Sequence, residues 1–368
     1  MKKIVIDARE LRTSTGRYME RLLHYLQEID TDLSHRYVVL LKPKDMETWE
    51  PISKRFTKVA CPYKEFTFAE QIGLLWQLVR LSPDLVHFAM VQQPILFQGK
   101  VVTTMHDLTT LRFDNPSKNR MVFQVKQSVY RWVNYIAAHK SKVIITGSEY
   151  VKDDVARVMR LNSRKITVTY EAGKKFVDEP EPIVGLVDKK FIMYVGRPNP
   201  HKNLDRLIEA FAVLKTDMPE LNLVLAGKRD SLYKHYASEV EEEGIKDVYF
   251  TGSVTDGQLR WLYEHTAAYV FPSLSEGFGL PGLEAMAHGA PVVSSNATCL
   301  PEIYGEAAYF FDPLDVDSMT KAITDVLTKP NLREKLINEG QAQVKKYSWR
   351  RMAEQTLSIY KNILGEAS

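Results

Sequence analysis

The stretch Ser273–Val293, SLSEGFGLPGLEAMAHGAPVV, holds two glutamates, Glu276 and Glu284, around a G-x-G-x-x-G pattern that begins at Gly277. We predict a loop around Glu276 and a short helix over Leu280–His288, which puts Glu284 one turn into that helix. Carboxylates accept hydrogen bonds from sugar hydroxyls, and a glycine turn at a helix N-terminus binds phosphate. The stretch favours a ligand with a sugar and a phosphate, although local pairing would also explain Glu284.

The same glycine pattern occurs in dinucleotide-binding proteins, where an acidic residue at the end of the next strand holds a ribose. Here the next predicted strand, Pro291–Ser295, ends in Ser-Ser-Asn, and the first acid after it is Glu302. The turn also comes late among the strands of its half of the chain. We therefore do not predict a nicotinamide or flavin site.

Two cations follow another predicted strand, Phe191–Val195. Arg197 comes directly after Gly196, and Lys202 stands just before the helix predicted for Leu204–Lys215. An arginine fork and a lysine point charge at the end of a parallel strand suit a diphosphate. The alternative is a pair of solvated loop cations that bind nothing.

The N-terminal half offers two weaker candidates. The strand Val101–Met105 runs into His106, which could donate to a sugar hydroxyl or move a proton, although a lone histidine is more often structural. Gly16 stands at the start of a predicted helix and offers a second backbone site for an anion. The sequence has no G-x-x-x-x-G-K-[ST] loop, no G-x-S-x-G elbow and no metal-binding cluster. We expect neither a P-loop ATPase nor a metal cofactor.

Composition indicates a globular protein with more than one core, since 45% of the 368 residues are apolar and 26% are charged. No apolar run is long enough for a membrane span, and Ile4–Ala8 is too short for a secretory core, so we predict a first strand there. The two cysteines, Cys61 and Cys299, favour a reducing compartment, hence the cytoplasm. Residues 1–173 carry 27 Lys and Arg against 18 Asp and Glu, and the remainder carries 22 against 28. The positive half could face an anionic membrane or a phosphorylated acceptor, or the asymmetry could mean nothing.

Short apolar runs alternate with segments of helical period along the whole chain. The predicted strands are Lys3–Ala8, Tyr37–Lys42, Leu85–Phe88, Val101–Asp107, Lys142–Ser148, Ile166–Glu171, Phe191–Arg197, Leu221–Gly227, Val248–Gly252, Ala267–Phe271, Pro291–Ser295 and Ala307–Phe311. Most lack alternation, which is typical of parallel strands covered by helices on both faces. The sequence thus predicts an α/β protein with two Rossmann-like, doubly wound domains facing across a cleft.

We place the first domain at residues 1–172, a polar linker at 173–188, the second domain at 189–346 and a terminal helix at 347–368. Ser348 is a suitable N-cap for the terminal helix. Its apolar residues exceed what a free tail needs, so we expect it to dock on a domain.

These features together closely resemble the family 4 glycosyltransferases, which have the two-domain GT-B fold. The most specific part is the step from Glu276 to Glu284, followed by Leu300-Pro301-Glu302 and Ala308–Pro313. The supporting stretches are MHD, TGSEYVKDDV, GRPNPHKN, TGSVTDGQL and SWRRMAEQTLSIY, and the resemblance covers most of the chain. One departure is VTYEAGKKF, which stands where many members have a proline-asparagine-glycine turn.

The resemblance implies a retaining transfer of a sugar from a nucleotide diphosphate sugar. It implies that Glu284 binds the ribose of the nucleotide and that Glu276 binds the hydroxyls of the donor sugar. Arg197 and Lys202 would bind the diphosphate. Protein cations in that role would leave no need for a metal.

Further roles carried over by position concern the backbone and the first domain. Amides offered to the phosphate and the sugar would come from Phe278, Gly279 and Leu280. Gly16 would let the first loop approach the diphosphate, and His106 would contact the donor sugar near the reacting carbon. The backbone near Val254 would read the base. The resemblance also implies acceptor binding by the first domain, donor binding by the second, and a terminal helix that returns to the first.

The donor and acceptor stay open at this stage. The motifs favour GDP-mannose, with UDP-glucose as the other choice, and a saccharide or lipid-linked acceptor of cell-surface polysaccharide synthesis. Lys118–Lys142 combines basic and aromatic residues and could meet the inner face of a membrane, or could be an ordinary amphipathic helix. We expect no nucleic acid partner. The alternatives are an epimerase or a phosphorylase on the same scaffold, and a noncatalytic nucleotide-sugar binder.

Overall fold

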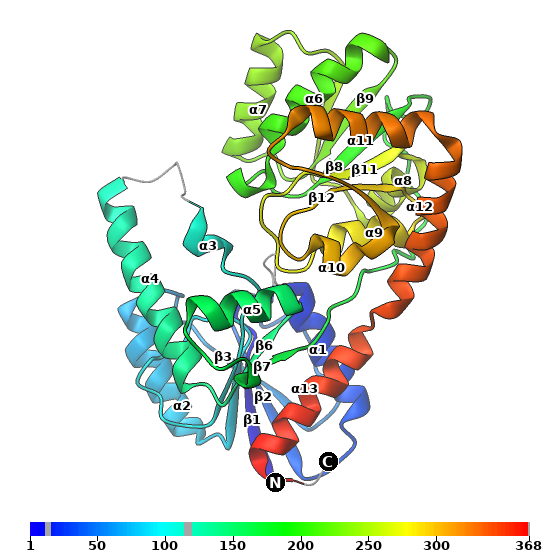
Figure 1. Ribbon diagram of the computed structural model, residues 1–368. Coiled ribbons are helices and arrows are strands. Elements are labelled where there is room, and N and C mark those ends of the chain that lie inside the picture. Colours follow the sequence, from blue (N-terminus) through cyan, green and yellow to red (C-terminus); the bar gives the residue numbers. More distant parts are fainter. Residues whose placement is uncertain (12–15, 114–119, 367–368) are drawn as a thin grey trace. The chain divides into compact units, whose positions relative to one another are not determined.

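The computed structural model describes residues 1–11, 16–113 and 120–366. The chain divides into two compact units (Figure 1). Unit 1 comprises Met1–Glu171 together with Ser348–Ser368, and unit 2 comprises Ala172–Tyr347. Each unit has its own parallel sheet covered by helices.

The sheet of unit 1 has the strand order β3-β2-β1-β4-β5-β6-β7, and every neighbouring pair is parallel. Its strands are β1 (Lys2–Asp7), β2 (His35–Leu41), β3 (Phe56–Ala60), β4 (Leu85–Phe88), β5 (Val101–Thr104), β6 (Val143–Thr146) and β7 (Ile166–Val168). The central strands are fully buried, which confirms the parallel sheet predicted from their unbroken apolar runs.

The sequence-based prediction of this sheet missed β3. This strand lies at the edge of the sheet, and only Phe56 is fully buried while Thr57 and Ala60 are exposed. An edge strand pairs with a neighbour on one side only and is less buried, so it needs few apolar residues. The sequence of β3, FTKVA, therefore lacks the apolar run that marks the other strands.

The helices of unit 1 are α1 (Gly16–Ile29), α2 (Leu75–Leu81), α3 (Thr109–Arg112), α4 (Arg120–Lys140), α5 (Glu149–Val158) and the C-terminal α13 (Trp349–Leu364). Ser348 caps α13 by accepting a hydrogen bond from the Arg351 amide, as predicted. The apolar face of α13 is buried, and the helix lies along α1 (Figure 1). The expected return of the terminal helix to the first domain is confirmed.

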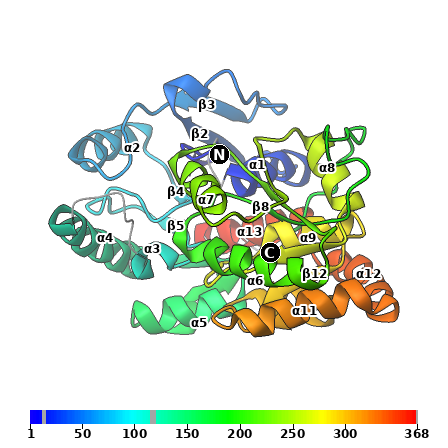
Figure 2. The same ribbon diagram turned by 90° about the horizontal axis from the view of Figure 1, so that it is seen from above.

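The sheet of unit 2 repeats the same topology with the order β10-β9-β8-β11-β12-β13. Its strands are β8 (Phe191–Val195), β9 (Asn222–Ala226), β10 (Val248–Gly252), β11 (Ala268–Phe271), β12 (Val292–Ser295) and β13 (Ala308–Phe311). Its helices are α6 (Leu204–Asp217), α7 (Ser231–Glu242), α8 (Asp256–His265), α9 (Leu280–Ala287), α10 (Leu300–Tyr304), α11 (Val316–Thr328) and α12 (Pro330–Gln343). Within unit 2, α11 packs on α6 and α12 packs on α9, as Figures 1 and 2 both show.

Residues 173–188, predicted as a linker, form no helix or strand and belong to unit 2. Phe176 and Leu186 are buried there, and the Glu181 amide donates to the Gly257 carbonyl. The segment is therefore fixed along unit 2 by apolar and hydrogen-bonded contacts.

Both sheets reverse their strand order at one place, between β1 and β4 in unit 1 and between β8 and β11 in unit 2. In open parallel sheets, ligands bind beyond the carboxyl ends of the strands at this switch point. The residues that follow these strands are where a site is expected. None of the helices in the described ranges is both long and apolar enough to cross a bilayer.

Candidate functional site

In unit 2, the two loops at the switch point are joined by an ion pair. Lys202 Nζ lies 2.6 Å from Glu276 Oε1, and the two side chains are 20% and 13% exposed. Lys202 ends the short helical turn after β8, and Glu276 lies in the loop after β11. The structure therefore brings together two residues that are 74 positions apart in the sequence.

Asn203 holds these loops in place. It has a left-handed backbone, with φ of 60°, between the turn and α6. Its buried amide donates to the Pro272 carbonyl at 3.0 Å and to the Pro313 carbonyl at 2.8 Å. The His201 carbonyl accepts from the Leu274 amide at 2.7 Å. Because these bonds fix both backbones, the ion pair is held by the fold and not by its own charges alone.

Arg197 lies nearby, directly after β8, and is mostly exposed. Its Nε donates to Asp230 Oδ2 at 2.9 Å, and Asp230 also caps α7 by accepting from the Leu232 and Tyr233 amides. Partial burial disfavours the charge of Asp230, but these amides and Arg197 hold its pKa below its ordinary value. The anchored carboxylate thus orients Arg197, whose terminal nitrogens have no other hydrogen-bond partner within the described part of the chain.

The glycine turn before α9 is shaped by Tyr304. The Tyr304 hydroxyl donates to the Gly279 carbonyl at 2.6 Å. A Cβ atom would lie 2.5 Å from this hydroxyl at Gly279 and 2.3 Å from it at Gly282. Gly279 also has a φ of 95°. Glycine is required at both positions by this close approach, whatever the turn binds.

The residues around this turn differ in accessibility. Phe278 is buried, with its ring edge-on to Tyr347 at 5.5 Å between centroids, so a ligand would meet its backbone. Leu280 is partly buried and begins α9, whose first turn also contains Pro281. Glu284 lies on the next turn of α9 and is only 2% exposed. A carboxylate so far removed from water depends on polar partners inside the unit.

Val254 lies beyond the end of β10, just before α8. The neighbouring Thr255 and Gln258 form a capping box that fixes the start of α8. Since β10 is two strands from β8 and strands are about 4.8 Å apart, Val254 lies about 10 Å from the Arg197 strand along the sheet edge. Unit 2 therefore spreads its predicted residues along one edge instead of gathering them at a point.

In unit 1, His106 follows β5, and both of its ring nitrogens face acceptors. Nε2 lies 3.1 Å from the Ala89 carbonyl, and Nδ1 lies 3.3 Å from Glu171 Oε1. Burial disfavours the charged ring, but Glu171 and the Ala89 carbonyl raise the pKa of His106 above its ordinary value. The doubly protonated ring satisfies both acceptors. Glu171 stands in the stretch that departs from the family pattern, and no sequence pattern predicted its pairing with His106.

A chain of buried hydrogen bonds connects α13 with the surroundings of His106. The Tyr360 hydroxyl meets His87 Nδ1 at 2.5 Å, His87 Nε2 meets Thr104 Oγ1 at 2.8 Å, and Thr104 Oγ1 meets the Tyr18 hydroxyl at 3.1 Å. The Tyr18 ring then stands edge-on to His106, with centroids 4.9 Å apart. Burial lowers the pKa of His87 to about 3, so its ring is neutral. Residues of α13, β4, β5 and α1 thus form one hydrogen-bonded chain, which holds the Tyr18 ring against His106.

Gly16 begins α1, two residues before Tyr18. A Cβ atom here would lie 2.0 Å from the Leu11 carbonyl oxygen, so only glycine fits. Packing alone accounts for this glycine, and the loop that precedes it, residues 12–15, lies outside the described residues.

Sequence reasoning also missed a buried ion cluster at the end of β1. Arg9 donates to both oxygens of Asp7, at 2.8 and 2.7 Å, and its guanidinium lies 2.8 Å from Glu70. The exposed fractions are 2% for Arg9, 8% for Asp7 and 1% for Glu70. Burial disfavours the guanidinium charge, but the two carboxylates hold the pKa of Arg9 above its ordinary value.

Across the described residues, no group of three or more His, Cys, Asp and Glu side chains is placed to hold a metal. The groups that could meet an anionic ligand in unit 2 are Arg197, Lys202 and the amides at the start of α9. Those that could meet hydroxyls are Glu276 and Glu284.

Two family descriptions match the chain, one for each unit. "Glycosyltransferase Family 4" matches residues 15–172, and "Glycosyl transferases group 1" matches residues 178–343.

Among curated relatives, the O-antigen chain mannosyltransferase B of Escherichia coli is 30% identical over 275 residues, which are 71% of this chain and 70% of that protein. A serotype-specific mannosyltransferase of Escherichia coli is 30% identical over 281 residues, and the match spans 72% of this chain but 34% of that protein. Among solved structures, an Anabaena protein in complex with UDP-glucose has a TM-score of 0.75 at 15% identity, covering 98% of this chain and 100% of that chain.

Proposed function

The chain belongs to the family 4 glycosyltransferases of GT-B fold, and from that premise we propose that it transfers a hexose from a nucleotide diphosphate sugar to a saccharide or lipid-linked acceptor in cell-surface polysaccharide synthesis. Mannose is the favoured sugar, because the matched relatives of Escherichia coli are named mannosyltransferases. An epimerase, a phosphorylase or a noncatalytic binder is not favoured, since these relatives are transferases.

The observation that carries the proposal is the Lys202–Glu276 pair at the switch point of unit 2. A donor diphosphate offers Lys202 a doubly charged partner in place of one carboxylate. Glu276 can then turn its oxygens to the hydroxyls of the donor sugar. A pair that keeps some exposure to water can exchange partners in this way, because water solvates both groups during the exchange.

Departure of the diphosphate places negative charge on the leaving phosphate. Arg197 and Lys202 supply two fixed positive charges beside it, and the first amides of α9 add hydrogen-bond donors after Phe278 and Gly279. Removing one such donor typically costs about 10²- to 10³-fold in kcat. With protein cations in this role, we propose that transfer needs no metal, so that activity survives treatment with a chelator.

The rest of the donor follows the edge of the sheet. We propose that the base meets the backbone at Val254 beyond β10, that the ribose meets Glu284, and that the diphosphate lies at the end of β8. Val254 follows β10, and Arg197 and Lys202 follow β8, so along the sheet the proposed positions of the base and the diphosphate are two strands apart.

For unit 1 we propose that Gly16 gives the diphosphate access to the loop before α1, and that His106 acts on the transferred sugar. Its cationic ring donates to sugar oxygens, while Glu171 balances the charge of the ring. Glu171 is paired with His106, and Glu276 is assigned to the sugar hydroxyls once the donor has taken Lys202, so neither carboxylate is left free to act as a nucleophile. We therefore propose that the anomeric configuration is retained by attack on the face that the diphosphate leaves. Proton NMR of the first product tests this, since an inverted anomeric signal would contradict it.

We propose a cytoplasmic setting against the inner face of the membrane. The unpaired, buried cysteines fit a reducing compartment, and the positive half of the chain fits an anionic surface.

The decisive experiment is a thermal-shift screen of the intact protein against GDP, UDP and ADP, followed by donor hydrolysis with the matching sugar nucleotide. We expect GDP to raise Tm most and GDP-mannose to be hydrolysed slowly without an acceptor. A larger Tm shift with UDP would identify a UDP-sugar as the donor in place of GDP-mannose. The absence of a shift with all three nucleotides would contradict the proposed function.

A further inference from the structure

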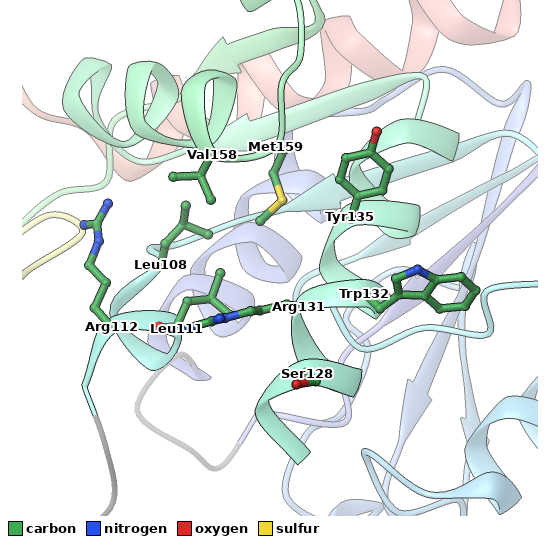
Figure 3. A pocket seen from close by; sticks show the side chains of 9 residues that line it. All are labelled: Leu108, Leu111, Arg112, Ser128, Arg131, Trp132, Tyr135, Val158 and Met159. Carbon is green, nitrogen blue, oxygen red and sulfur yellow. Dashed lines mark hydrogen bonds between the residues drawn. The ribbon is translucent and has the colours of Figure 1, made fainter. Parts of the chain in front are cut away.

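A hollow of about 530 Å³ lies in unit 1 among α3, α4 and α5. Figure 3 shows Trp132 and Tyr135 of α4 on one side of it and Val158 and Met159 at the end of α5 on another. Leu108 and Leu111 line it beside α3. Its volume is within the range of small-molecule sites.

The floor and the rim of this hollow differ. Leu108 and Met159 belong to the buried core of unit 1. Trp132, in contrast, is 64% exposed, and Tyr135 and Val158 are 43% and 44% exposed. The apolar lining is therefore open to solvent at its rim, while its floor is part of the hydrophobic core of unit 1.

A positive charge borders this lining. The Arg131 guanidinium lies along the hollow and makes only a long hydrogen bond, 3.4 Å, to the Leu111 carbonyl among the described residues. Arg112, by comparison, is tied to the buried Asp154. Residues 115–148 contain six Lys and Arg and no Asp or Glu. Of the two arginines in the lining, Arg131 is therefore the one better placed to meet an anion.

Two other occupants fit this lining less well. A saccharide would bury hydroxyls against leucine, valine and methionine side chains that return no hydrogen bonds, and only Ser128, Tyr135 and the two arginines could bond to it. A second copy of the chain would bring the same positive stretch against itself across a two-fold interface. An amphiphile with an apolar chain and an anionic head matches both the lining and the charge.

We propose that this hollow binds the hydrocarbon chain of a single isoprenyl phosphate or diphosphate, with Arg131 meeting the phosphate. Leu108 lies two residues after His106, so one wall of the hollow and the His106 ring both follow the end of β5. On the proposed function, which this step rests on, the hollow holds the lipid part of a lipid-linked acceptor.

The test is titration calorimetry of the intact protein with farnesyl phosphate below its micelle concentration, with inorganic phosphate and farnesol as partial probes. We expect farnesyl phosphate to bind and inorganic phosphate not to bind. Trp132→Ala should weaken farnesyl phosphate at least tenfold. Its matched control is Trp76→Ala, since Trp76 is 60% exposed on α2 and outside the hollow. Arg131→Gln should weaken farnesyl phosphate but leave farnesol unchanged.

Equal affinity of wild-type and Trp132→Ala protein for farnesyl phosphate would overturn the proposal. Binding to phosphatidylglycerol vesicles that farnesyl phosphate does not displace would point to a bilayer surface and also overturn it. The proposal would also be overturned if light scattering showed the wild type as a dimer and Trp132→Ala as a monomer. The nucleotide screen separates the two ideas. A thermal shift with GDP, UDP or ADP without farnesyl phosphate binding refutes the hollow alone, and the absence of a shift with all three refutes the function.

Discussion

The switch points of the two sheets carry ion pairs in different surroundings. After β8 and β11, Lys202 and Glu276 are 20% and 13% exposed, and within the described residues each has the other as its ionic partner. At the end of β1, Arg9 is 2% exposed and is enclosed by Asp7, Glu70 and the Tyr63 carbonyl. The same topology therefore holds an open pair in unit 2 and a closed cluster in unit 1.

We propose that this difference separates charges that bind a ligand, in unit 2, from charges that stabilise the fold, in unit 1. A closed cluster cannot exchange a partner without leaving a buried charge unpaired, which is costly. A partly exposed pair can exchange a partner, because water or a ligand takes the place of the partner that leaves. We therefore expect substitutions in the first to reduce stability and substitutions in the second to reduce transfer.

The largest effect should come from Arg9→Met. Loss of the guanidinium leaves Asp7 and Glu70 buried without a cation, which costs about 3–5 kcal/mol of the free energy of unfolding. For a unit of this size that lowers Tm by roughly 10 °C, measured by thermal denaturation. Arg9→Lys keeps the charge and should lose less. A Tm within about 2 °C of the wild type would mean that the cluster is not structural.

Lys202→Ala should reduce the rate of transfer and leave the stability of the protein nearly unchanged. We expect kcat to fall about 10²- to 10³-fold, since a charge beside the leaving phosphate is lost, while Tm stays close to the wild type. Initial rates with the donor found in the nucleotide screen measure this. Lys215→Ala is the matched control, because Lys215 is 17% exposed and pairs with Asp247 elsewhere in unit 2. Full activity of the Lys202 variant would sink the donor-site assignment.

Tyr360→Phe, on α13, should have an intermediate effect on both stability and kcat. It leaves the buried His87 Nδ1 without its partner, at a cost of about 1–3 kcal/mol in stability. If the chain through Thr104 and Tyr18 positions His106, kcat should also fall while the KM for the donor stays constant. Tyr347→Phe, which removes a hydroxyl bonded to Ile303 in unit 2, is the control. A change in stability with unaltered kcat would make the chain purely structural.

The smallest effect is expected from Glu171→Gln and appears as a pH dependence. The raised pKa keeps His106 charged to higher pH, so a step that needs the cation fails as pH rises through that value. The amide removes the main stabilising charge and moves this loss to lower pH. The stabilisation from the pair shows the same sign, being complete below the ordinary pKa of histidine and lost as pH rises. Profiles of kcat/KM and Tm against pH check both, and an unshifted alkaline limb would argue against the pairing.

Much of unit 2 could be predicted from the sequence because its signals are local. Apolar runs marked all six strands, and the glycine turn with Pro281 marked the start of α9. In unit 1, β3 escaped because an edge strand needs few apolar residues. Lys118, within the basic stretch, lies outside the described residues, and α4 spans the rest of that segment up to Lys140.

The sequence by itself determined two doubly wound parallel sheets, the return of the terminal helix, and the residue types that could meet a diphosphate and a sugar. These follow from periodicity, turns and spacing, which act over a few residues. Only the tertiary structure decided which polar and charged side chains meet. Lys202 finds Glu276 across 74 positions, Tyr360 finds His87 across 273, and Arg9 finds Glu70. Such pairs form because parallel strands bring distant loops to one edge of a sheet, where burial then decides which pairs stay open.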